Sequence, residues 1–200
     1  MNRFAMGSTS KLVGLSGTLN AGKDTAAQYL VSEHGFMHVS SGDVLRVEAA
    51  RQGRDDSRPT LIEIGVELRK QYGTLGAIVI RGIEQWQEQR EAFAAGLVVS
   101  GLRVVGEAQE VKDQNGKLVF VDAPVEERYR RMVARSRDAE ANMSFEEFVA
   151  HERVELEGLG GPERPHLRAV ETISDVVLHN IDEQSFLPAL AQALGLANAN

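Results

Sequence analysis

The stretch Gly17-Thr-Leu-Asn-Ala-Gly-Lys-Asp-Thr25 decides how the rest of the chain is interpreted. It places two glycines five residues apart and follows the second glycine with Lys23. An apolar run, Leu12 to Leu15, comes before it, and a helical pattern, Thr25 to Val31, comes after it. A phosphate-binding loop needs this order of strand, glycine-rich loop and helix, because backbone N–H groups and the helix N-terminus then face one anion.

The loop supplies candidate phosphate contacts and one irregular position. Lys23 offers a positive charge to the β- and γ-phosphates of ATP. Asp24 stands where such loops usually carry a magnesium-binding Ser or Thr, and Thr25 offers a hydroxyl one residue later. Mg²⁺ would be held by Thr25, by Asp24 or mainly through water. The candidate ATP-binding residues of the loop are Gly17, Asn20, Ala21, Gly22, Lys23, Asp24 and Thr25. The alternative is a glycine-rich turn with a solvated lysine.

Length, charge and composition narrow the possible functions. The 200 residues suffice for one domain, and the net charge of −7 argues against binding nucleic acid through overall charge. The chain has no cysteine, so disulfides and thiol chemistry are excluded. No apolar stretch approaches eighteen residues, and the N-terminus has no signal-peptide pattern. We therefore expect a cytoplasmic monomer or homodimer that binds small molecules, with no nucleic-acid or membrane partner.

Five short apolar runs predict strands. None alternates between apolar and polar residues, as expected for strands that are covered on both faces. Helical patterns separate the runs, so we predict an α/β domain with a parallel sheet between two helical layers. Ligands of such sheets bind beyond the carboxyl ends of the strands. The runs are Leu12–Leu15, Phe36–Val39, Leu97–Val99, Leu118–Val121 and Val176–Leu178.

Start and stop signals predict where the helices lie. Ser144 and Glu147 have the spacing of a capping box, which predicts a helix from about Phe145 to Leu156. Ser185 is the predicted cap of the last helix. The other predicted helices are Asp43 to about Gly53, a helix opened by Pro59, Leu75 to Phe93, Pro124 to Arg135 and a short one before the fifth strand.

The motif after the second strand, His38-Val-Ser-Ser-Gly-Asp-Val-Leu-Arg46, resembles the nucleoside monophosphate kinases, adenylate kinase among them. Their phosphate loop has Gly-Lys-Gly-Thr where this chain has Gly-Lys-Asp-Thr, so Thr25 keeps their hydroxyl. The resemblance implies the three-layer P-loop NTPase fold of these kinases, with five parallel strands and helices on both faces. It also implies ATP and Mg²⁺ as cofactors.

The same resemblance implies a site for the acceptor nucleotide. Arg46 would bind the acceptor phosphate, beside Ser41, and Asp43 would orient or deprotonate the acceptor. Asp43 also matches, less closely, an aspartate of the dephospho-CoA kinases. The alternative is that Asp43 caps a helix and Arg46 is a surface residue. The acceptor-binding helical region would cover about residues 42–95, with Arg69 as a further contact.

Val98-Val-Ser-Gly-Leu-Arg103 follows the third strand. It resembles small kinase-like domains that carry Asp-Gly/Ser-Ile-Arg and then a Glu. This resemblance implies that Arg103 and Glu107 belong to the acceptor site. Ser100 stands where that family places an acidic Walker B residue. We hypothesise that Asp24 compensates for the acid missing at Ser100.

Five arginines lie within residues 128–137, after the fourth strand. Phosphoryl transfer needs positive charge around the migrating group, and in nucleotide kinases arginines of a short lid supply it. Arg131, Arg135 and Arg137 are the candidates, with a lid at about 136–147. The alternative is a solvated face with Glu126–Arg130 and Glu127–Arg131 pairs. Tyr129, Met132 and Val133 should pack, and Glu152 and Glu155 should form structural pairs rather than reach magnesium.

The tail Ile173-Ser-Asp-Val-Val-Leu-His-Asn180 resembles that of the dephospho-CoA kinases, which implies that Asn180 lies near the adenine of ATP. We expect one domain, 1–200, that transfers the γ-phosphate of ATP to a nucleoside or deoxynucleoside monophosphate. Alternatives are a dephospho-CoA kinase-like activity, or a nucleotide-binding regulator or NTPase with weakened catalysis. The expected catalytic residues are Lys23, Asp43, Arg103, Arg131, Arg135 and Arg137.

Overall fold

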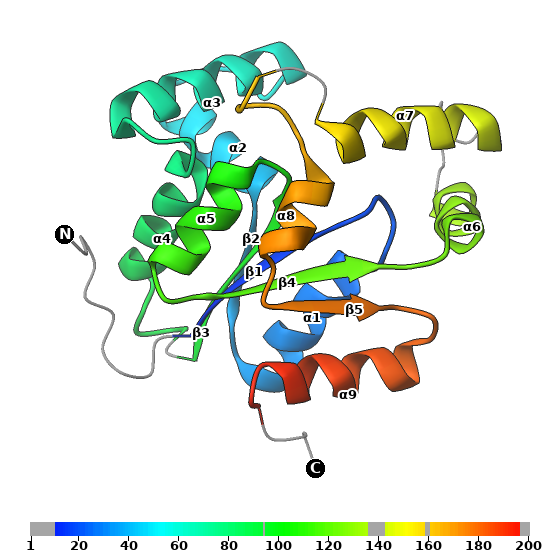
Figure 1. Cartoon of the computed structure of the whole chain (residues 1–200). Coiled ribbons are helices and arrows are strands. Elements are labelled where there is room, and N and C mark those ends of the chain that lie inside the picture. Colours follow the sequence, from blue (N-terminus) through cyan, green and yellow to red (C-terminus); the bar gives the residue numbers. More distant parts are fainter. Residues whose placement is uncertain (1–10, 94, 136–142, 159–160, 197–200) are drawn as a thin grey trace.

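A five-stranded parallel sheet with strand order β2-β3-β1-β4-β5 forms the centre of the molecule (Figure 1). The computed structural model describes residues 11–93, 95–135, 143–158 and 161–196. Each of the five predicted apolar runs overlaps a strand, so the predicted parallel sheet is confirmed. The strands are β1 (Lys11–Gly17), β2 (Met37–Ser40), β3 (Gly96–Leu102), β4 (Lys117–Asp122) and β5 (Val176–His179).

Helices cover both faces of the sheet, which makes three layers (Figure 1). One face packs against α1 (Lys23–His34) and α9 (Glu183–Ala193). The opposite face packs against α2 (Ser41–Arg51), α4 (Ala77–Glu88), α5 (Val105–Asp113) and α8 (Leu167–Ile173). The remaining helices lie outside these layers: α3 (Arg58–Tyr72) packs on α2 and α4, and α6 (Val125–Arg135) packs on α7 (Phe145–Glu157).

Neighbouring residues of one strand enter different cores, which explains why the strands show no alternation in the sequence. In β3, Val98 packs in the cluster that includes Leu30 of α1. Val99, the next residue, packs in the cluster that includes Trp86 of α4. Each of these four side chains is buried. A strand with two dry faces therefore needs an apolar residue at every position.

Parallel pairing brings the carboxyl ends of the strands to one edge. In the register, Ser100 of β3 pairs with Leu15 of β1 and with Ser40 of β2. The phosphate loop after β1, the start of α2 after β2 and Arg103 after β3 therefore meet at this edge. The sheet positions three motifs that are far apart in the sequence.

Two helix boundaries differ from the prediction. Helix α4 ends at Glu88 and not at Phe93, because the Trp86 indole N–H donates to the Phe93 carbonyl (2.9 Å) and fixes a turned segment there. Helix α9 is capped by Asp182 and not by Ser185, since the Asp182 carboxylate accepts the Ser185 N–H (2.8 Å).

Helix α5 was not predicted. Its buried side is short and is formed by Glu107, Ala108 and Val111, which makes too weak an apolar pattern to recognise.

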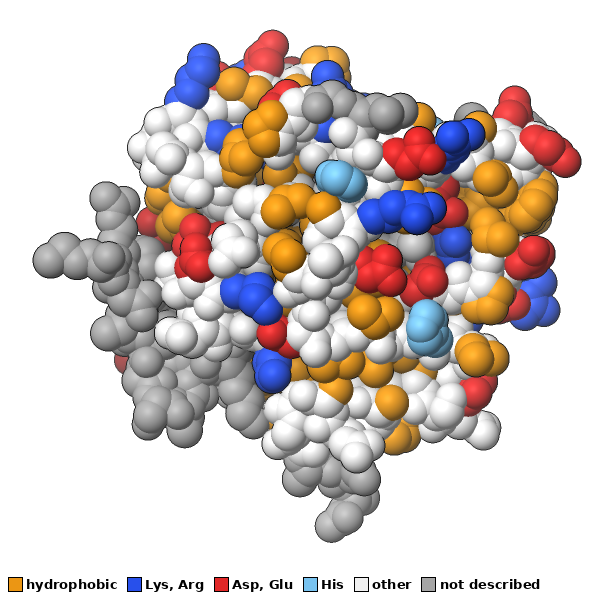
Figure 2. All heavy atoms as spheres, viewed as in Figure 1, with side chains coloured by type: hydrophobic (Ala, Val, Ile, Leu, Met, Phe, Trp, Pro, Cys, Tyr) orange, Lys and Arg blue, Asp and Glu red, His pale blue; other side chains and the backbone are white. Residues whose placement is uncertain are grey.

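The prediction that Met132 and Val133 of α6 both pack against the core was partly wrong. Met132 is buried as expected, but Val133 is 43% exposed. Val149 and Val154 of α7 are exposed as well. Figure 2 shows hydrophobic side chains gathered at the edge of the molecule where α6 lies. Within the described part of the chain, no helix has the length and apolar character needed to cross a membrane.

The predicted capping box of α7 is confirmed and has a measurable consequence. The Ser144 hydroxyl accepts the Glu147 N–H (3.1 Å), and the Glu147 carboxylate accepts the Ser144 N–H (2.8 Å). We expect Ser144→Ala to lower the free energy of unfolding by about 1 kcal/mol in urea denaturation, because it leaves the Glu147 N–H without its cap. Ser32→Ala on α1 removes only a 3.5 Å contact and is the control. Equal effects of the two substitutions would contradict the capping role.

Candidate functional site

The phosphate loop between β1 and α1 depends on two glycines. Gly17 and Gly22 have φ values of 138° and 106°, which L-residues with side chains rarely adopt. A Cβ atom on Gly17 would lie 1.9 Å from the Val121 carbonyl oxygen, and one on Gly22 would lie 2.1 Å from Asn180 Nδ2. The loop is therefore packed against the ends of β4 and β5. The loop conformation predicted from the glycine spacing is present.

Lys23 is the first residue of α1, and its ammonium folds back over the loop. Nζ donates to the carbonyl oxygens of Gly17 (2.9 Å) and Thr18 (2.6 Å). Burial, together with the positive charge of Arg103, lowers the pKa of Lys23 to about 8. A phosphate in the loop would stabilise the charged form of this amine, so the site favours an anion.

Asn180 and Arg131 hold the back of the loop. The buried Asn180 amide donates to the Ala21 carbonyl oxygen (2.8 Å). Arg131 donates to the carbonyl oxygens of Ala21 and Asn180 (3.2 Å each) and to Glu127 (3.1 Å). The Glu127–Arg131 pair that we considered as an alternative is thus present. Arg130 also pairs with Glu127, not with the predicted Glu126. In this structure Arg131 supports the loop from behind.

The lid lies mostly outside the described residues. Arg137 and the other residues from 136 to 142 are among those not described, and so is the side chain of Arg135. The predicted contacts of Arg135 and Arg137 with the transferred phosphate stay predictions.

Asp43 and Arg46 pair with each other in this structure, and their predicted contacts with the acceptor stay predictions. The Asp43 carboxylate accepts the N–H (3.1 Å) and hydroxyl (2.6 Å) of Ser40 and pairs with Arg46 (2.9 Å). Partial burial opposes it, but the hydrogen bonds from Ser40 and the charge of Arg46 lower the pKa of Asp43, which makes a weaker base. Both side chains are more than half exposed, and neither is among the described residues that line the cavity beside the loop. The alternative, a helix-capping acid with a surface arginine, describes them.

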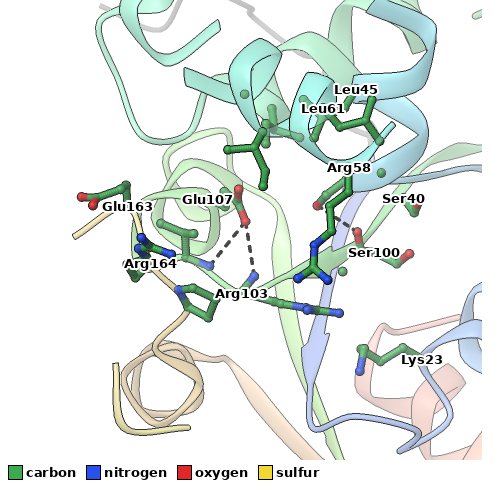
Figure 3. A pocket seen from close by; sticks show the side chains of 18 of the residues that line it. Lys23, Ser40, Leu45, Arg58, Leu61, Ser100, Arg103, Glu107, Glu163 and Arg164 are labelled. Carbon is green, nitrogen blue, oxygen red and sulfur yellow. Dashed lines mark hydrogen bonds between the residues drawn. The ribbon is translucent and has the colours of Figure 1, made fainter. Parts of the chain in front are cut away.

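A cavity of about 840 Å³ opens beside the phosphate loop (Figure 3). Its walls come from the loop, the start of α2, helix α3, the end of β3 and residues 163–165. It is positively charged although the whole chain is acidic. The cationic lining residues are Lys23, Arg58, Arg69, Arg103 and Arg164, and the acidic ones are Asp24, Glu107 and Glu163. The apolar wall is formed by Leu45, Leu61, Ile62, Val66, Ile78 and Val104.

The cavity contains four of the predicted acceptor residues: Ser41, Arg69, Arg103 and Glu107. The Glu107 carboxylate accepts the backbone N–H of Arg103 (3.3 Å) and a long contact from Arg69 (3.5 Å), and Figure 3 shows it facing the cavity. Burial raises the pKa of Glu107. The Ser41 hydroxyl donates to the Ser100 carbonyl oxygen (3.2 Å). The structure therefore brings these residues together, from three different elements.

Ser100 occupies the place of the missing acid without supplying a charge. Its buried hydroxyl lies 2.8 Å from Nε2 of His38, and burial lowers the pKa of His38, so this pair is neutral at pH 7. Asp24 lines the cavity in the first turn of α1. The described residues contain no cluster of three or more metal-binding His, Cys, Asp or Glu. Mg²⁺ commonly binds through one or two protein ligands plus phosphates and water, and the predicted role of Asp24 and Thr25 as such ligands stays a prediction.

Sequence reasoning missed Arg58 and the segment Glu163-Arg164-Pro165. Arg58 precedes the proline that opens α3, and residues 163–165 belong to a polar turn before α8. Neither stretch matches a phosphate-binding pattern. Only the path of the chain brings both to the cavity.

Two acids of α7 bind two arginines of different burial. Glu152 makes a buried, two-point pair with Arg128, whose guanidinium also donates to the Ala123 carbonyl oxygen (2.7 Å). Glu155 pairs with Arg103 at the cavity (2.7 Å), where the Arg103 side chain is 44% exposed. The predicted structural pairing of these acids is confirmed, with Arg128 and Arg103 as their partners among the described residues.

Comparisons with known proteins agree with this site. A family model described as an AAA domain matches residues 13–151. A UPF0200/UPF0201 protein of Archaeoglobus fulgidus is 33% identical over 72% of the chain, but the match covers only 45% of that protein. A UPF0200 protein of Methanosarcina mazei is 30% identical, with 66% of this chain and 70% of the relative covered. Shikimate kinase of Bacteroides thetaiotaomicron superposes with a TM-score of 0.57 at 15% identity over 93% of this chain and 99% of that one.

The two acids of α7 allow a matched comparison. We expect Glu152→Ala to lower the free energy of unfolding by about 3–5 kcal/mol, because it leaves the buried Arg128 charge unpaired. Glu155→Ala should cost about 1 kcal/mol or less, since Arg103 stays in contact with water. Urea denaturation of both variants measures the difference. Similar losses would show that the Arg128–Glu152 pair does not support the fold in this way.

The lowered pKa of Lys23 predicts proton uptake on ATP binding. Above pH 8 the amine is largely neutral in the free protein, and bound phosphate should restore its charge and its proton. At pH 8.5 we expect ATP binding to take up a substantial fraction of one proton, and at pH 7 little from this group. Calorimetry in buffers of different ionisation enthalpy measures the uptake. Lys23→Arg, which does not titrate, should abolish it, and uptake that persists in this variant would rule out Lys23 as the source.

Proposed function

Because the chain belongs to the AAA-domain family and has the fold of the P-loop kinases, we propose that it transfers the γ-phosphate of ATP to a phosphorylated acceptor. A nucleoside or deoxynucleoside monophosphate is the acceptor that the motifs favour. The proposal depends on the observation that one continuous cavity is lined both by the phosphate loop and by the arginines beyond it. This cavity joins Lys23 and the phosphate loop to a second region with four arginines and an apolar wall.

The ATP half of the proposed reaction uses the loop. Backbone N–H groups between Gly17 and Thr25, together with the N-terminus of α1, would bind the phosphates, and Lys23 would neutralise their charge. Mg²⁺, when bound, would neutralise charge on the transferred group, and Asp24 and Thr25 would hold it. Asn180 and Arg131 keep the loop in shape. Among the described residues, the buried Oδ1 of Asn180 has no hydrogen-bond partner, which leaves it an acceptor for a ligand or a water.

The acceptor half uses the end of β3. Arg103 is close enough to Lys23 to affect its pKa, so it stands between the two substrates, where charge develops during transfer. Arg69 and Glu107 would contact the acceptor deeper in the cavity. An acceptor with both a charged phosphate and an uncharged body matches such walls, because arginines suit the phosphate and aliphatic side chains suit the body.

Two alternatives have support of their own. Dephospho-CoA also carries phosphate, and the resemblance of the tail favours it. A regulator or an NTPase with weakened catalysis is favoured by Ser100, since the neutral His38–Ser100 pair adds no charge for Mg²⁺. The four arginines beyond the loop argue against water as the only acceptor.

A screen of ADP release with ATP and Mg²⁺ tests the proposal. We expect at least one common ribo- or deoxyribonucleoside monophosphate to raise ADP release tenfold or more over the acceptor-free rate. Lys23→Ala should lower the stimulated rate by about 100-fold or more, since it removes the charge that stabilises the transferred group. An unchanged melting temperature would show that this variant stays folded.

The other outcomes separate the alternatives. Stimulation by dephospho-CoA alone would favour the second acceptor. ADP release that no acceptor changes would indicate an NTPase, and ATP binding without turnover would indicate a regulator. Either of these last two results would overturn the kinase proposal.

A further inference from the structure

Arg58 enters the cavity from the wall opposite the end of β3. It is the first residue of α3, and Figure 3 shows its guanidinium pointing toward Ser100 and Arg103, above Lys23. In the part of the chain that the structure describes, this guanidinium has neither a hydrogen-bond nor an ion-pair partner. Arg69 and Arg103 of the same cavity each contact a carboxylate. Arg58 is therefore available to a ligand.

The segment before α3 fixes the position of Arg58. The Asp55 carboxylate accepts the Ser57 N–H (2.9 Å) and the Thr60 hydroxyl (2.8 Å), on either side of Arg58. Arg54 pairs with Glu63 (2.5 Å) and also with a second acid of α3. These contacts tie the start of α3 to the helix itself. The side chain that they support lines the cavity and is exposed to solvent.

Two guanidinium groups that face the same space repel each other unless an anion lies between them. Arg58 and Arg103 come from different elements and point toward one another (Figure 3). Each guanidinium presents a planar fork of N–H donors that matches phosphate oxygens. The pair thus forms the two sides of an anion site next to Lys23. Arg164 lines the same cavity, but Glu163 beside it offsets its charge.

The apolar part of α3 indicates what the anion is attached to. Ile62 and Val66 line the cavity and are 60% and 41% exposed. Arg58, Ile62 and Val66 follow one another at intervals of four residues. They therefore lie on the same side of α3. Exposed aliphatic side chains beside a cationic site gain from contact with an uncharged body that carries a negative group.

We infer that Arg58 and Arg103 clamp the phosphate of the acceptor, in place of Arg46, and that Ile62 and Val66 contact the body of an organic monophosphate. This inference rests on the proposed function. It moves the acceptor phosphate away from the position implied by the Ser-Gly-Asp-Val-Leu-Arg motif. Arg46 is bound to Asp43 outside the cavity, whereas Arg58 lines the cavity and has no partner among the residues that the structure describes.

A matched pair of variants tests the clamp. Lys70 lies on the same helix, is exposed and does not line the cavity, so Lys70→Ala removes one positive charge without touching the site. We expect Arg58→Ala to raise the KM for the phosphorylated acceptor tenfold or more. The KM for ATP and the melting temperature should stay near the wild-type values, and Lys70→Ala should resemble the wild type in all three. Arg46→Ala should change the acceptor KM less than Arg58→Ala.

The unphosphorylated nucleoside provides a second readout. The wild type should prefer the monophosphate over its nucleoside, and Arg58→Ala should lose most of that preference. A substitution that only disturbed packing would change both rates together. If Arg58→Ala behaves like Lys70→Ala on an acceptor that the protein phosphorylates, the clamp is wrong while the kinase proposal stands.

Inorganic phosphate tests the clamp if no acceptor is phosphorylated. With the phosphate loop saturated by a non-hydrolysable ATP analogue, phosphate should raise the melting temperature of the wild type and of Lys70→Ala, but not of Arg58→Ala. This result would support the anion site even with the kinase proposal lost. No stabilisation of the wild type, or equal stabilisation of all three proteins, would overturn it.

Discussion

The close packing of the phosphate loop against the ends of β4 and β5 is the constraint on which the site depends. Gly17 and Gly22 leave no room for a side chain, because Val121 and Asn180 fill that space. Hydrogen bonds to the Ala21 carbonyl oxygen from Asn180 and Arg131 close the loop from behind. This packing directs Lys23 toward the cavity. A loop that was free to move would hold neither the lysine nor the backbone N–H groups ready for phosphate.

Helix α7 contacts both a buried arginine of the protein interior and an arginine that lines the cavity. Glu152 holds the buried Arg128, which also contacts the end of β4, and Glu155, three residues later, holds Arg103 at the cavity. One helix face therefore restrains a structural arginine and an arginine proposed to contact both substrates. A shift of α7 that released Glu155 would free the Arg103 charge, so the Arg103–Glu155 contact connects α7 to the cavity.

The distribution of charge explains how an acidic protein can bind anionic ligands. The chain has a net charge of −7, yet the cavity lining carries five cationic residues against three acids. Most surface arginines are paired with nearby carboxylates, as Arg51 is with Glu88. The arginines of the cavity place positive charge where ligand phosphates would bind in the proposed function. The low polarity of the surrounding wall strengthens its effect over short distances.

Local patterns determined much of the fold. The strand–loop–helix order around GTLNAGKDT and the five apolar runs predicted the phosphate loop and the parallel sheet, because glycine geometry and burial leave direct marks on a sequence. The capping box of Ser144 and Glu147 could also be predicted, because it depends only on residues three apart in the sequence. Helix α5 was not predicted, because its apolar face is weak. The end of α4 was predicted wrongly, because a single hydrogen bond from an indole to a carbonyl fixes the turn that follows it.

Only the tertiary structure decided which charged residues form the site. The spacing of Asp43 and Arg46 matched a family motif, but Asp43 belongs to the capping box of α2 and both side chains are more than half exposed. Arg58 and Arg164 matched no motif, and they line the cavity. A sequence shows which residues can bind phosphate. It does not show which way their side chains point or which distant segments meet, because these follow from the packing of α3 and of residues 163–165 against the end of β3.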